Sequence, residues 1–349
     1  MNITLKNISK RYGKLTVLDG LNLSFADGAL TALLGPSGCG KTTILNIISG
    51  VLHPDRGDVF FGDRCVTDMH LSRRNIGYVF QNYALYPNMT AYENLKFPLT
   101  NLPLPGKNRA EKKEYYDQQI MQIARLLRIE DALRRYPSEL SGGQQQRIAL
   151  GRAIIRKPDI LLMDEPFANL DRKLSIEMRE EIRQIQQKTG LTTIFVTHNQ
   201  TDANAISDQI VLMNKGEIQQ TGTPSQLYDE PVNLFCVDFF GEYGANILDR
   251  YALLSCCPGL ISCWPRQAST AVCRPEDVTV IAGDGPFKVR NSTHMGGRWL
   301  HQMQCGHLRL SALTDEKLSV GTRIALAIMP DGLNFYDSQG HRLPAAEVE

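Results

Sequence analysis

The chain has 349 residues, which is long for a single hydrophobic core and predicts two domains. Its 38 Lys and Arg residues almost balance its 37 Asp and Glu residues, so the formal net charge is +1 and nucleic acid is not expected as a main partner. No stretch approaches the ~20 apolar residues of a membrane-spanning helix, and Met1 to Leu5 have the pattern of a strand rather than of a signal peptide.

The cysteines give little support to a metal site. There are eight of them, without the paired CxxC spacing that is typical of zinc ligands. Cys256, Cys257 and Cys263 are close enough in sequence to suggest one ligand cluster. The favoured interpretation is that the cysteines are scattered small apolar residues in a reducing cytosol.

The first 30 residues alternate apolar and polar side chains in short runs, with turn signals at Tyr12-Gly13 and Asp27-Gly28. This pattern predicts antiparallel strands. The apolar run from Leu30 to Leu34 follows and predicts a buried strand. A helix is expected from Thr42 to Ser49, ended by Gly50 in a C-terminal cap position.

The segment between that strand and that helix fits the pattern G-x-x-x-x-G-K-[ST]. Glycines let backbone N–H groups approach phosphate oxygens, and the helix N-terminus adds a favourable dipole. Lys41 is expected to reach the β- and γ-phosphates, and the Thr42 hydroxyl to ligate Mg²⁺. The alternative is a glycine-rich turn, which the two flanking elements disfavour. The residues predicted to bind ATP here are Gly35, Pro36, Ser37, Gly38, Cys39, Gly40, Lys41, Thr42 and Thr43.

Residues 84–150 have a different character, with a charged helical stretch from Ala110 to Arg128 and little strand signal. Near the end of this insertion, the run Ser141, Gly142, Gly143 and Gln144 opens a helix predicted from Gln145 to Ile155. Ser141 is a natural N-cap, and the glycines expose backbone amides, so the run is a second anion site. We expect it to lie on the far side of the insertion from the first phosphate loop. A second copy of the chain, related by two-fold symmetry, is therefore expected to bring the two half-sites together.

Strand patterns return at Ile160–Met163 and Thr192–Thr197, separated by a helical pattern from Lys173 to Lys188. This alternation predicts parallel strands with crossover helices, and hence an α/β domain with a helical insertion. Asp164 and Glu165 follow the first of these strands. Asp164 is expected to hold Mg²⁺ and Glu165 to activate the attacking water as a general base. The alternative is that Glu165 only caps the next helix.

Three further residues are candidates because of where they stand. Gln81 follows a strand-like run and is expected to contact Mg²⁺ or the water, although a lone glutamine there is a weak signal. His198 also follows a strand, at the sheet edge where ligands bind in open α/β folds, and is expected to contact the γ-phosphate. The alternative for His198 is a structural role. Tyr12 is a candidate for stacking on adenine, against the alternative of an exposed turn tyrosine.

Taken together, these motifs resemble those of ATP-binding-cassette ATPases, in family order, over residues 1 to about 240. The resemblance identifies 35–42 as Walker A, Gln81 as the Q-loop and Leu140–Gln144 as the signature. It also identifies Asp164 and Glu165 as Walker B, and His198 as the switch histidine. The D-loop is Asn169-Leu170-Asp171, and Tyr12 matches the adenine-stacking aromatic.

A narrower likeness links the chain to import ATPases of the maltose and glycerol-phosphate type. It rests on Phe80 to Thr90 with Tyr92-Glu93-Asn94, on Gly142 to Arg147, and on Thr197 to Gln200. Two departures are Ala168, where relatives usually have Ser, and Asn199, where they usually have Asp.

The tail has a different texture from about residue 240, with short strand patterns separated by Pro and Gly. Arg274-Pro275-Glu276-Asp277 resembles the TOBE-type β domain of ferric-iron, polyamine, sulfate and sugar importers. The expected fold is therefore an α/β P-loop NTPase of the ABC type, with its helical insertion at 84–150, followed by a small all-β, OB- or TOBE-like domain. The expected domains are 1–240 and 241–349.

The resemblance implies an enzyme that binds ATP and Mg²⁺ and couples ATP hydrolysis to solute uptake. The chain is expected to lie at the cytoplasmic face of the bacterial inner membrane. Its expected partners are a second copy of itself in a head-to-tail dimer, two transmembrane permease subunits and, indirectly, a solute-binding protein. The permease is expected to dock on Gln81 to Phe97, where aromatic residues with Pro87 are expected to give an exposed apolar surface. These aromatic residues are Tyr83, Tyr86, Tyr92 and Phe97. The alternative is that they belong to the core of the helical insertion, which is expected for some of them.

The first choice of solute is a sugar or sugar-phosphate, with ferric iron, polyamine or phosphonate as the alternative. A non-transport cassette ATPase of translation or DNA repair is a second function class, disfavoured because the chain carries one cassette and a β tail. An exporter subunit is a third, which the TOBE-like tail also disfavours.

Overall fold

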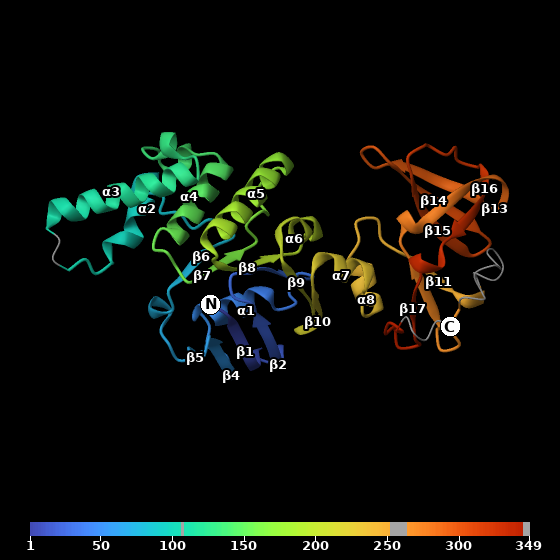
Figure 1. The fold of residues 1–349 in the computed structure, drawn as a ribbon, viewed down its shortest axis with the longest axis horizontal. Helices are drawn as coiled ribbons and strands as arrows, with labels where there is room; N and C mark the ends of the chain where they lie inside the picture. The colour runs from blue at the N-terminus through green and yellow to red at the C-terminus, as the bar shows by residue number, and fades with distance from the viewer. Residues whose placement is uncertain (106–107, 252–263, 345–349) are drawn as a thin grey trace. The chain divides into compact units, whose positions relative to one another are not determined.

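The computed structural model of the chain describes residues 1–105, 108–251 and 264–344 (Figure 1). It forms two compact units, Met1–Pro224 and Ser225–Glu349. The division precedes the domain boundary expected near residue 240, because residues just before 240 bond to the tail. Leu234 N–H donates to the Gly340 carbonyl at 3.1 Å, and Arg274 Nη1 donates to the Val237 carbonyl at 3.0 Å.

The first unit begins with a four-stranded antiparallel sheet in the order β2-β1-β4-β5. Its strands are β1 (Ile3–Tyr12), β2 (Leu15–Phe25), β4 (Arg56–Phe61) and β5 (Arg64–Cys65). Ile3 pairs with Phe25 on one side and with Phe61 on the other. The antiparallel strands predicted for the first 30 residues are therefore confirmed.

A six-stranded sheet in the order β10-β9-β3-β8-β7-β6 forms the rest of the unit's β structure in the described residues. Its strands are β3 (Leu30–Leu34), β6 (Ile76–Val79), β7 (Ile160–Asp164), β8 (Thr192–Thr197), β9 (Gln209–Asn214) and β10 (Glu217–Gly222). All neighbours from β9 to β6 pair in parallel, and only β10 runs antiparallel. Parallel strands with crossover helices were expected from the alternation of patterns, and this expectation is confirmed.

The helices of the first unit are α1 (Lys41–Ser49), α2 (Ala91–Thr100), α3 (Arg109–Leu126), α4 (Gly142–Ile154), α5 (Arg172–Thr189) and α6 (Gln200–Ile206). Figure 1 shows α2, α3 and α4 grouped together, as the helical insertion predicted for 84–150 requires. On α5, Met178, Ile182 and Ile185 are buried at helical spacing, which explains why this segment forms an amphipathic crossover.

The core of the first unit joins side chains of both sheets to α1, among them Ile8 and Val196 from the two sheets and Ile47 from α1. The C-terminal end of α1 is held by Arg74, which is only 4% exposed. Arg74 Nη1 donates to the carbonyls of Ile47 and Ile48 at 2.9 and 2.8 Å. Because carbonyls at a helix end have no intrahelical partner and carry negative partial charge, this cation both caps and neutralises the helix end.

Replacing Arg74 with Met is expected to destabilise the first unit by about 3 kcal/mol, because the buried carbonyls lose charged donors while the apolar stem is kept. Urea unfolding of the full chain measures the change. The neighbouring Arg73 is exposed, so Arg73→Met is the matched control, with an expected change within about 0.5 kcal/mol. Equal unfolding midpoints for the two variants would contradict the capping role of Arg74.

The second unit contains α7 (Pro224–Asp229) except for its first residue, and α8 (Leu234–Phe239). Its described strands pair only in antiparallel fashion. One sheet has the order β11-β12-β17 and the other β15-β14-β13-β16. The strands are β11 (Asn246–Asp249), β12 (Thr270–Cys273), β13 (Val278–His294), β14 (Trp299–Cys305), β15 (Leu308–Thr314), β16 (Arg323–Ile328) and β17 (Asn334–Tyr336). The small all-β domain expected for the tail is therefore confirmed, and its TOBE-type character stays a prediction.

Two expectations from the sequence concern membranes and metals. Among the described helices, none is both long and apolar enough to cross a membrane. The described residues also contain no group of three His, Cys, Asp or Glu side chains placed to hold a metal ion. The candidate cluster Cys256, Cys257 and Cys263 lies outside the described residues.

Candidate functional site

The candidate residues gather at one edge of the six-stranded sheet. Strands β3, β8, β7 and β6 are consecutive neighbours and run parallel, so their carboxyl ends lie along the same edge. The phosphate loop follows β3, Gln81 follows β6, Glu165 follows β7 and His198 follows β8. Ligands of open α/β sheets bind at this edge, because loops from several strands converge there.

The phosphate loop leads from β3 into α1 through a tight turn. Gly35 has φ 153°, and a Cβ at this position would lie 2.3 Å from the Met213 carbonyl oxygen, so only glycine fits. Gly40 caps α1 without any side-chain hydrogen bond, which leaves the N–H groups of the first turn available to an anion. The buried Lys41 donates from Nζ to the carbonyls of Gly35 and Pro36 at 2.8 and 2.9 Å.

Two oxygen ligands suited to Mg²⁺ meet between α1 and β7. The Thr42 hydroxyl donates to Asp164 Oδ1 at 3.1 Å. Burial, with a contribution from the neighbouring Glu165 charge, raises the pKa of Asp164 above its usual range, against the opposing influence of Thr42 and Lys41. A carboxyl group held in this way favours a cation beside it, and hard divalent cations prefer oxygen ligands, so the pair fits Mg²⁺.

Glu165 lies between the two other catalytic candidates. Gln81 Nε2 donates to Glu165 Oε2 at 3.2 Å, and His198 Nδ1 lies 3.1 Å from Glu165 Oε1. Glu165 also has φ 46°, in the left-handed region that a side chain with a Cβ rarely adopts, and its N–H donates to the Val196 carbonyl at 3.1 Å. Strained backbone of this kind is concentrated at functional sites, where neighbouring structure holds it in place.

Gln81, Glu165 and His198 thus come from three different strand ends and form one hydrogen-bonded cluster. A carboxylate oriented by an amide and an imidazole can accept a proton from a water molecule and hold that water in place. The structure joins Gln81 to this cluster rather than to Thr42 or Asp164. Its role as a Mg²⁺ ligand therefore stays a prediction.

Tyr12 is the last residue of β1 and is 49% exposed. The next strand of the same hairpin, β2, packs against the phosphate loop. A Cβ on Gly40 would lie 3.0 Å from Leu18 Cδ2 and 3.4 Å from Val17 Cγ1, both of β2. The ring is therefore on an element that packs beside the loop. The stacking of this ring on a base stays a prediction.

The signature segment, Ser141–Gln144, forms the beginning of α4 as a capping box. Ser141 Oγ accepts from the Gln144 N–H at 3.3 Å, and Gln144 Oε1 accepts from the Ser141 N–H at 3.1 Å. In the described part of the chain, each of these two side chains accepts from the backbone N–H of the other residue, and neither bonds a residue of the phosphate loop. Figure 1 shows α4 grouped with α2 and α3, apart from α1. The helix starts at Gly142, earlier than the expected Gln145.

The segment predicted to form a docking surface, Gln81–Phe97, is only partly exposed. Tyr86 and Phe97 are each 39% exposed and their rings are in contact, with centroids 4.8 Å apart. Tyr83, however, is buried, and Tyr92 is half-buried and hydrogen-bonds Asp117. For Tyr83, the alternative of a core side chain in the helical insertion is therefore confirmed.

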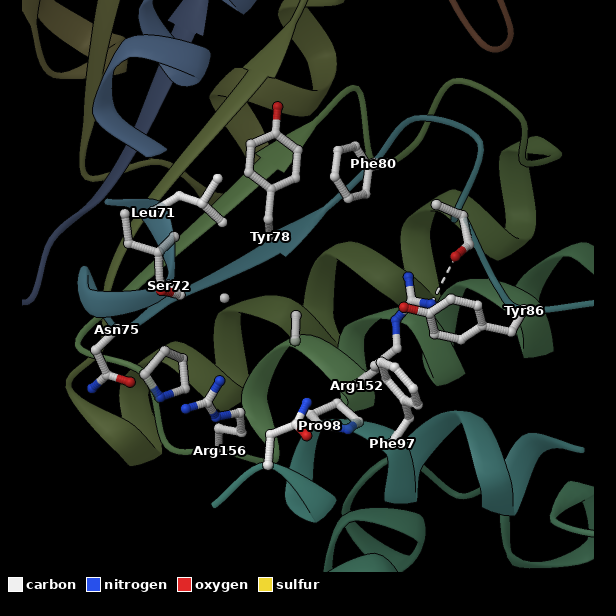
Figure 2. Close-up of a pocket in the computed structure, with 16 residues that line it drawn as sticks. Leu71, Ser72, Asn75, Tyr78, Phe80, Tyr86, Phe97, Pro98, Arg152 and Arg156 are labelled. Carbon is white, nitrogen blue, oxygen red and sulfur yellow. Dashed lines mark hydrogen bonds between the residues drawn. The ribbon is translucent and has the colours of Figure 1, made fainter. Parts of the chain in front are cut away.

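A groove of about 530 Å³ lies beside these two aromatic residues, between β6, α2 and α4. Figure 2 shows Arg152 next to Tyr86 and Phe97, with Arg156 farther along the groove near Asn75. Tyr78 and Phe80 contribute aromatic rings from the end of β6. The groove is therefore largely apolar with two guanidinium groups in its wall.

Sequence reasoning missed Arg152 and Asn94, which hold this segment in shape. Arg152 donates to the carbonyls of Tyr83 and Ala84 at 2.9 and 2.7 Å, and both of these residues have positive φ. Asn94 is fully buried, accepts from the Tyr86 N–H at 2.9 Å and donates to the Met89 carbonyl at 3.1 Å. No local pattern marks Arg152, because its partners are 68 and 69 residues away in sequence.

Comparison with known proteins gives a consistent result. A family model described as "ABC transporter" matches residues 18–168. The sn-glycerol-3-phosphate import ATP-binding protein UgpC of Rhizobium meliloti is 38% identical over 98% of this chain and 99% of its own length. The trehalose/maltose import ATP-binding protein MalK of Thermococcus litoralis is 45% identical over 71% of this chain and 66% of its own length. The Fe(3+) ions import ATP-binding protein FbpC of Fusobacterium nucleatum is 46% identical over 71% of this chain and 64% of its own.

Solved structures agree with this result. The cassette MJ0796, described as a bacterial ABC transporter cassette and solved as a dimer, has a TM-score of 0.57 at 31% identity. It covers 63% of this chain and 98% of its own. The same cassette in a post-hydrolysis state with ADP and Pi has a TM-score of 0.56. The cbiO1 protein of Clostridium perfringens, part of the complex cbiONQ, has a TM-score of 0.59 at 25% identity and covers 65% of this chain and 90% of its own.

Proposed function

This chain belongs to the family of ABC transporter ATPases, and on that premise we propose that it powers an importer of a sugar or sugar-phosphate. It is an ATP-binding subunit that couples ATP hydrolysis to transport. The observation that carries the proposal is the convergence of the phosphate loop, Gln81, Glu165 and His198 at one sheet edge.

The chemistry is phosphoryl transfer to water, in which catalysis is mainly positioning and charge stabilisation. The phosphate loop with Lys41 binds the triphosphate, and Glu165 accepts a proton from the attacking water while Gln81 and His198 orient its carboxylate. Thr42 and Asp164 would hold Mg²⁺, which when bound would supply positive charge to neutralise the phosphates. Tyr12 stacks on the adenine.

The second half of the site comes from a second copy of the chain. Ser141 and Gly142 are exposed at the N-terminus of α4, and among the residues that the structure describes the capping box bonds none of its own phosphate loop. The similar cassette MJ0796 is described as dimeric. A head-to-tail dimer of this chain places each signature segment on the ATP bound by the other copy, so the two nucleotides lie between the subunits.

The groove beside Tyr86, Phe97 and Arg152 is where a cytoplasmic segment of the permease docks. It is concave and apolar, and Arg152 ties its wall to α4, the helix that begins at the signature segment. Movement of α4 during ATP-driven closure is therefore expected to move the wall of the groove. Two transmembrane permease subunits complete the machine, with this chain bound at the cytoplasmic face of the inner membrane, and a solute-binding protein delivers the solute from outside.

The choice of solute class rests on coverage. The glycerol-3-phosphate relative aligns with 98% of this chain, including the β tail, whereas the trehalose/maltose and ferric-iron relatives each align with 71%. A sugar or sugar-phosphate is therefore favoured over ferric iron, polyamine or phosphonate. A cassette ATPase without a permease would lack any use for the apolar groove.

The docking surface gives the test of the importer assignment. In a tagged chain purified in detergent from the cells that produce it, Phe97→Asp is expected to lower the amount of co-purified permease by about tenfold, because a charge enters an apolar interface. Quantitative mass spectrometry identifies and measures the membrane proteins. The same experiment, followed by uptake of labelled sugars and sugar-phosphates in a strain that lacks the chain, identifies the solute.

The matched control is Leu126→Asp, since Leu126 is 36% exposed against 39% for Phe97 and lies in the same helical insertion outside the groove. It is expected to keep the permease. Equal loss in both variants, or the absence of any integral membrane protein in the wild-type preparation, would refute docking at the groove.

A further inference from the structure

The two glycines of the signature segment have opposite surroundings. Gly142 is exposed, and a Cβ built on it would meet no atom within 4 Å. Gly143 is buried, and a Cβ built on it would lie 2.6 Å from Leu174 Cδ2, 2.8 Å from Cδ1 and 3.1 Å from Cγ. The first glycine therefore leaves open space for a ligand, whereas the second leaves space for a leucine of its own chain.

Leu174 is placed by the D-loop, Asn169-Leu170-Asp171. Asp171 is the N-cap of α5, and its Oδ1 accepts from the Leu174 N–H at 3.0 Å. The backbone of Leu174 is therefore fixed to the D-loop while its side chain covers Gly143 of the signature segment. Two loops that are separate in sequence are thus connected through one half-buried side chain.

The next turns of the same helices add two further links. Arg147 Nη2 of α4 lies 2.6 Å from Glu181 Oε1 of α5, and each side chain is only 16% exposed. Gln146 Nε2, which is buried, donates to the Pro166 carbonyl just before the D-loop. Because all three contacts lie in the first turns of α4, its N-terminal end is tied to α5 and the D-loop rather than free to turn.

We propose that Leu174 is a positioning residue for ATP-driven dimerisation, and that Gly143 is glycine so that Leu174 can fix the signature segment to the D-loop of the same chain. The two loops then meet the partner copy as one preformed surface. This preorganisation lowers the cost of ordering the interface. The inference rests on the proposed contact between Ser141–Gln144 and the ATP of the second copy.

The test is a rescue experiment in the Glu165→Gln background, with sizing by light scattering at a series of protein concentrations with ATP. Gly143→Ala is expected to raise the concentration needed for dimerisation by about tenfold, because the new Cβ displaces Leu174 and with it the start of α4. Adding Leu174→Ala makes room for the Cβ and is expected to return dimerisation to within about threefold of the parent.

Gly142→Ala is the matched control, since it adds the same atom to the neighbouring residue in open space. Leu174→Ala is expected to leave the dimerisation defect of Gly142→Ala as it is. Rescue of both glycine variants, or of neither, would overturn the positioning role. A thermal midpoint restored in Gly143→Ala/Leu174→Ala without restored dimerisation would also overturn it, because the contact would then serve stability alone.

Ser141→Arg separates this inference from the function on which it rests. If Ser141→Arg forms the ATP-driven dimer as the parent does, the contact in trans is refuted, and the positioning role falls with it. If Ser141→Arg abolishes the dimer but Leu174→Ala fails to rescue Gly143→Ala, only the positioning role is refuted.

Discussion

Replacement of Glu165 by Gln is expected to lower the ATPase turnover by at least about 10²-fold while ATP binding is kept. The amide keeps the size and shape of the side chain and can still bond Gln81 and His198. It removes the carboxylate that we propose accepts a proton from water. Because the phosphate loop lies on a different strand end, nucleotide affinity does not depend on this carboxylate.

Steady-state phosphate release and equilibrium nucleotide binding, measured on the same preparation, separate the two effects. Glu217→Gln is the matched control, since Glu217 is exposed on β10, an edge strand, and its turnover is expected to match that of the parent chain. Wild-type turnover in Glu165→Gln would remove Glu165 from the role of general base.

Ser141→Arg is expected to abolish ATP-driven dimerisation. The substitution removes the hydroxyl that accepts from the Gln144 N–H and places a long cation at the start of α4, where the helix dipole already carries positive partial charge. The loss of the cap is expected to cost about 1 kcal/mol, which the chain tolerates, whereas the arginine fills the space proposed for the nucleotide of the partner copy. ATP binding by the monomer is expected to persist.

Light scattering with ATP in the Glu165→Gln background measures the dimer, and a nucleotide-binding assay checks the monomer. Ser319→Arg makes the same change at an exposed serine of the second unit and is expected to dimerise normally. A dimer of unchanged stability in Ser141→Arg would refute the shared site. A loss of nucleotide binding by the monomer would show that Ser141 contributes to the nucleotide site of its own chain, which would also contradict the shared site.

Local sequence patterns were sufficient for the elements that carry the site. The apolar run Leu30–Leu34 and the glycines after it specify strand, loop and helix, because each choice there is fixed by backbone geometry. The same is true of Ile160–Asp164 and of the cap at Ser141. Local patterns were not sufficient where a side chain's environment depends on distant residues. Tyr83 looks like its exposed neighbour Tyr86 in sequence, and it is buried because Arg152 holds the turn that it occupies.

The boundary between the compact units is a second case of this kind. A change of texture near residue 240 is visible in the sequence, but α7 and α8 belong with the tail because Val237 and Leu234 bond to Arg274 and Gly340. Contacts between residues so far apart in sequence leave no periodic pattern of apolar residues that could reveal them. Asn199 is a position where the local pattern was sufficient. Although it stands where relatives usually have Asp, its side chain still caps α6 by accepting from the Thr201 N–H at 2.8 Å.

By itself, the sequence determined which chemical groups this protein has and the order in which they occur. Phosphate binding, acid–base groups and helix caps depend on residue types at short fixed spacings, and those spacings are read directly from the chain. Tertiary structure decided which of these groups meet. Parallel pairing of β6, β7 and β8 brought Gln81, Glu165 and His198 within hydrogen-bond distance, and α4–α5 packing gave the two signature glycines different surroundings. Such contacts join residues far apart in sequence, and only the folded backbone sets their distances.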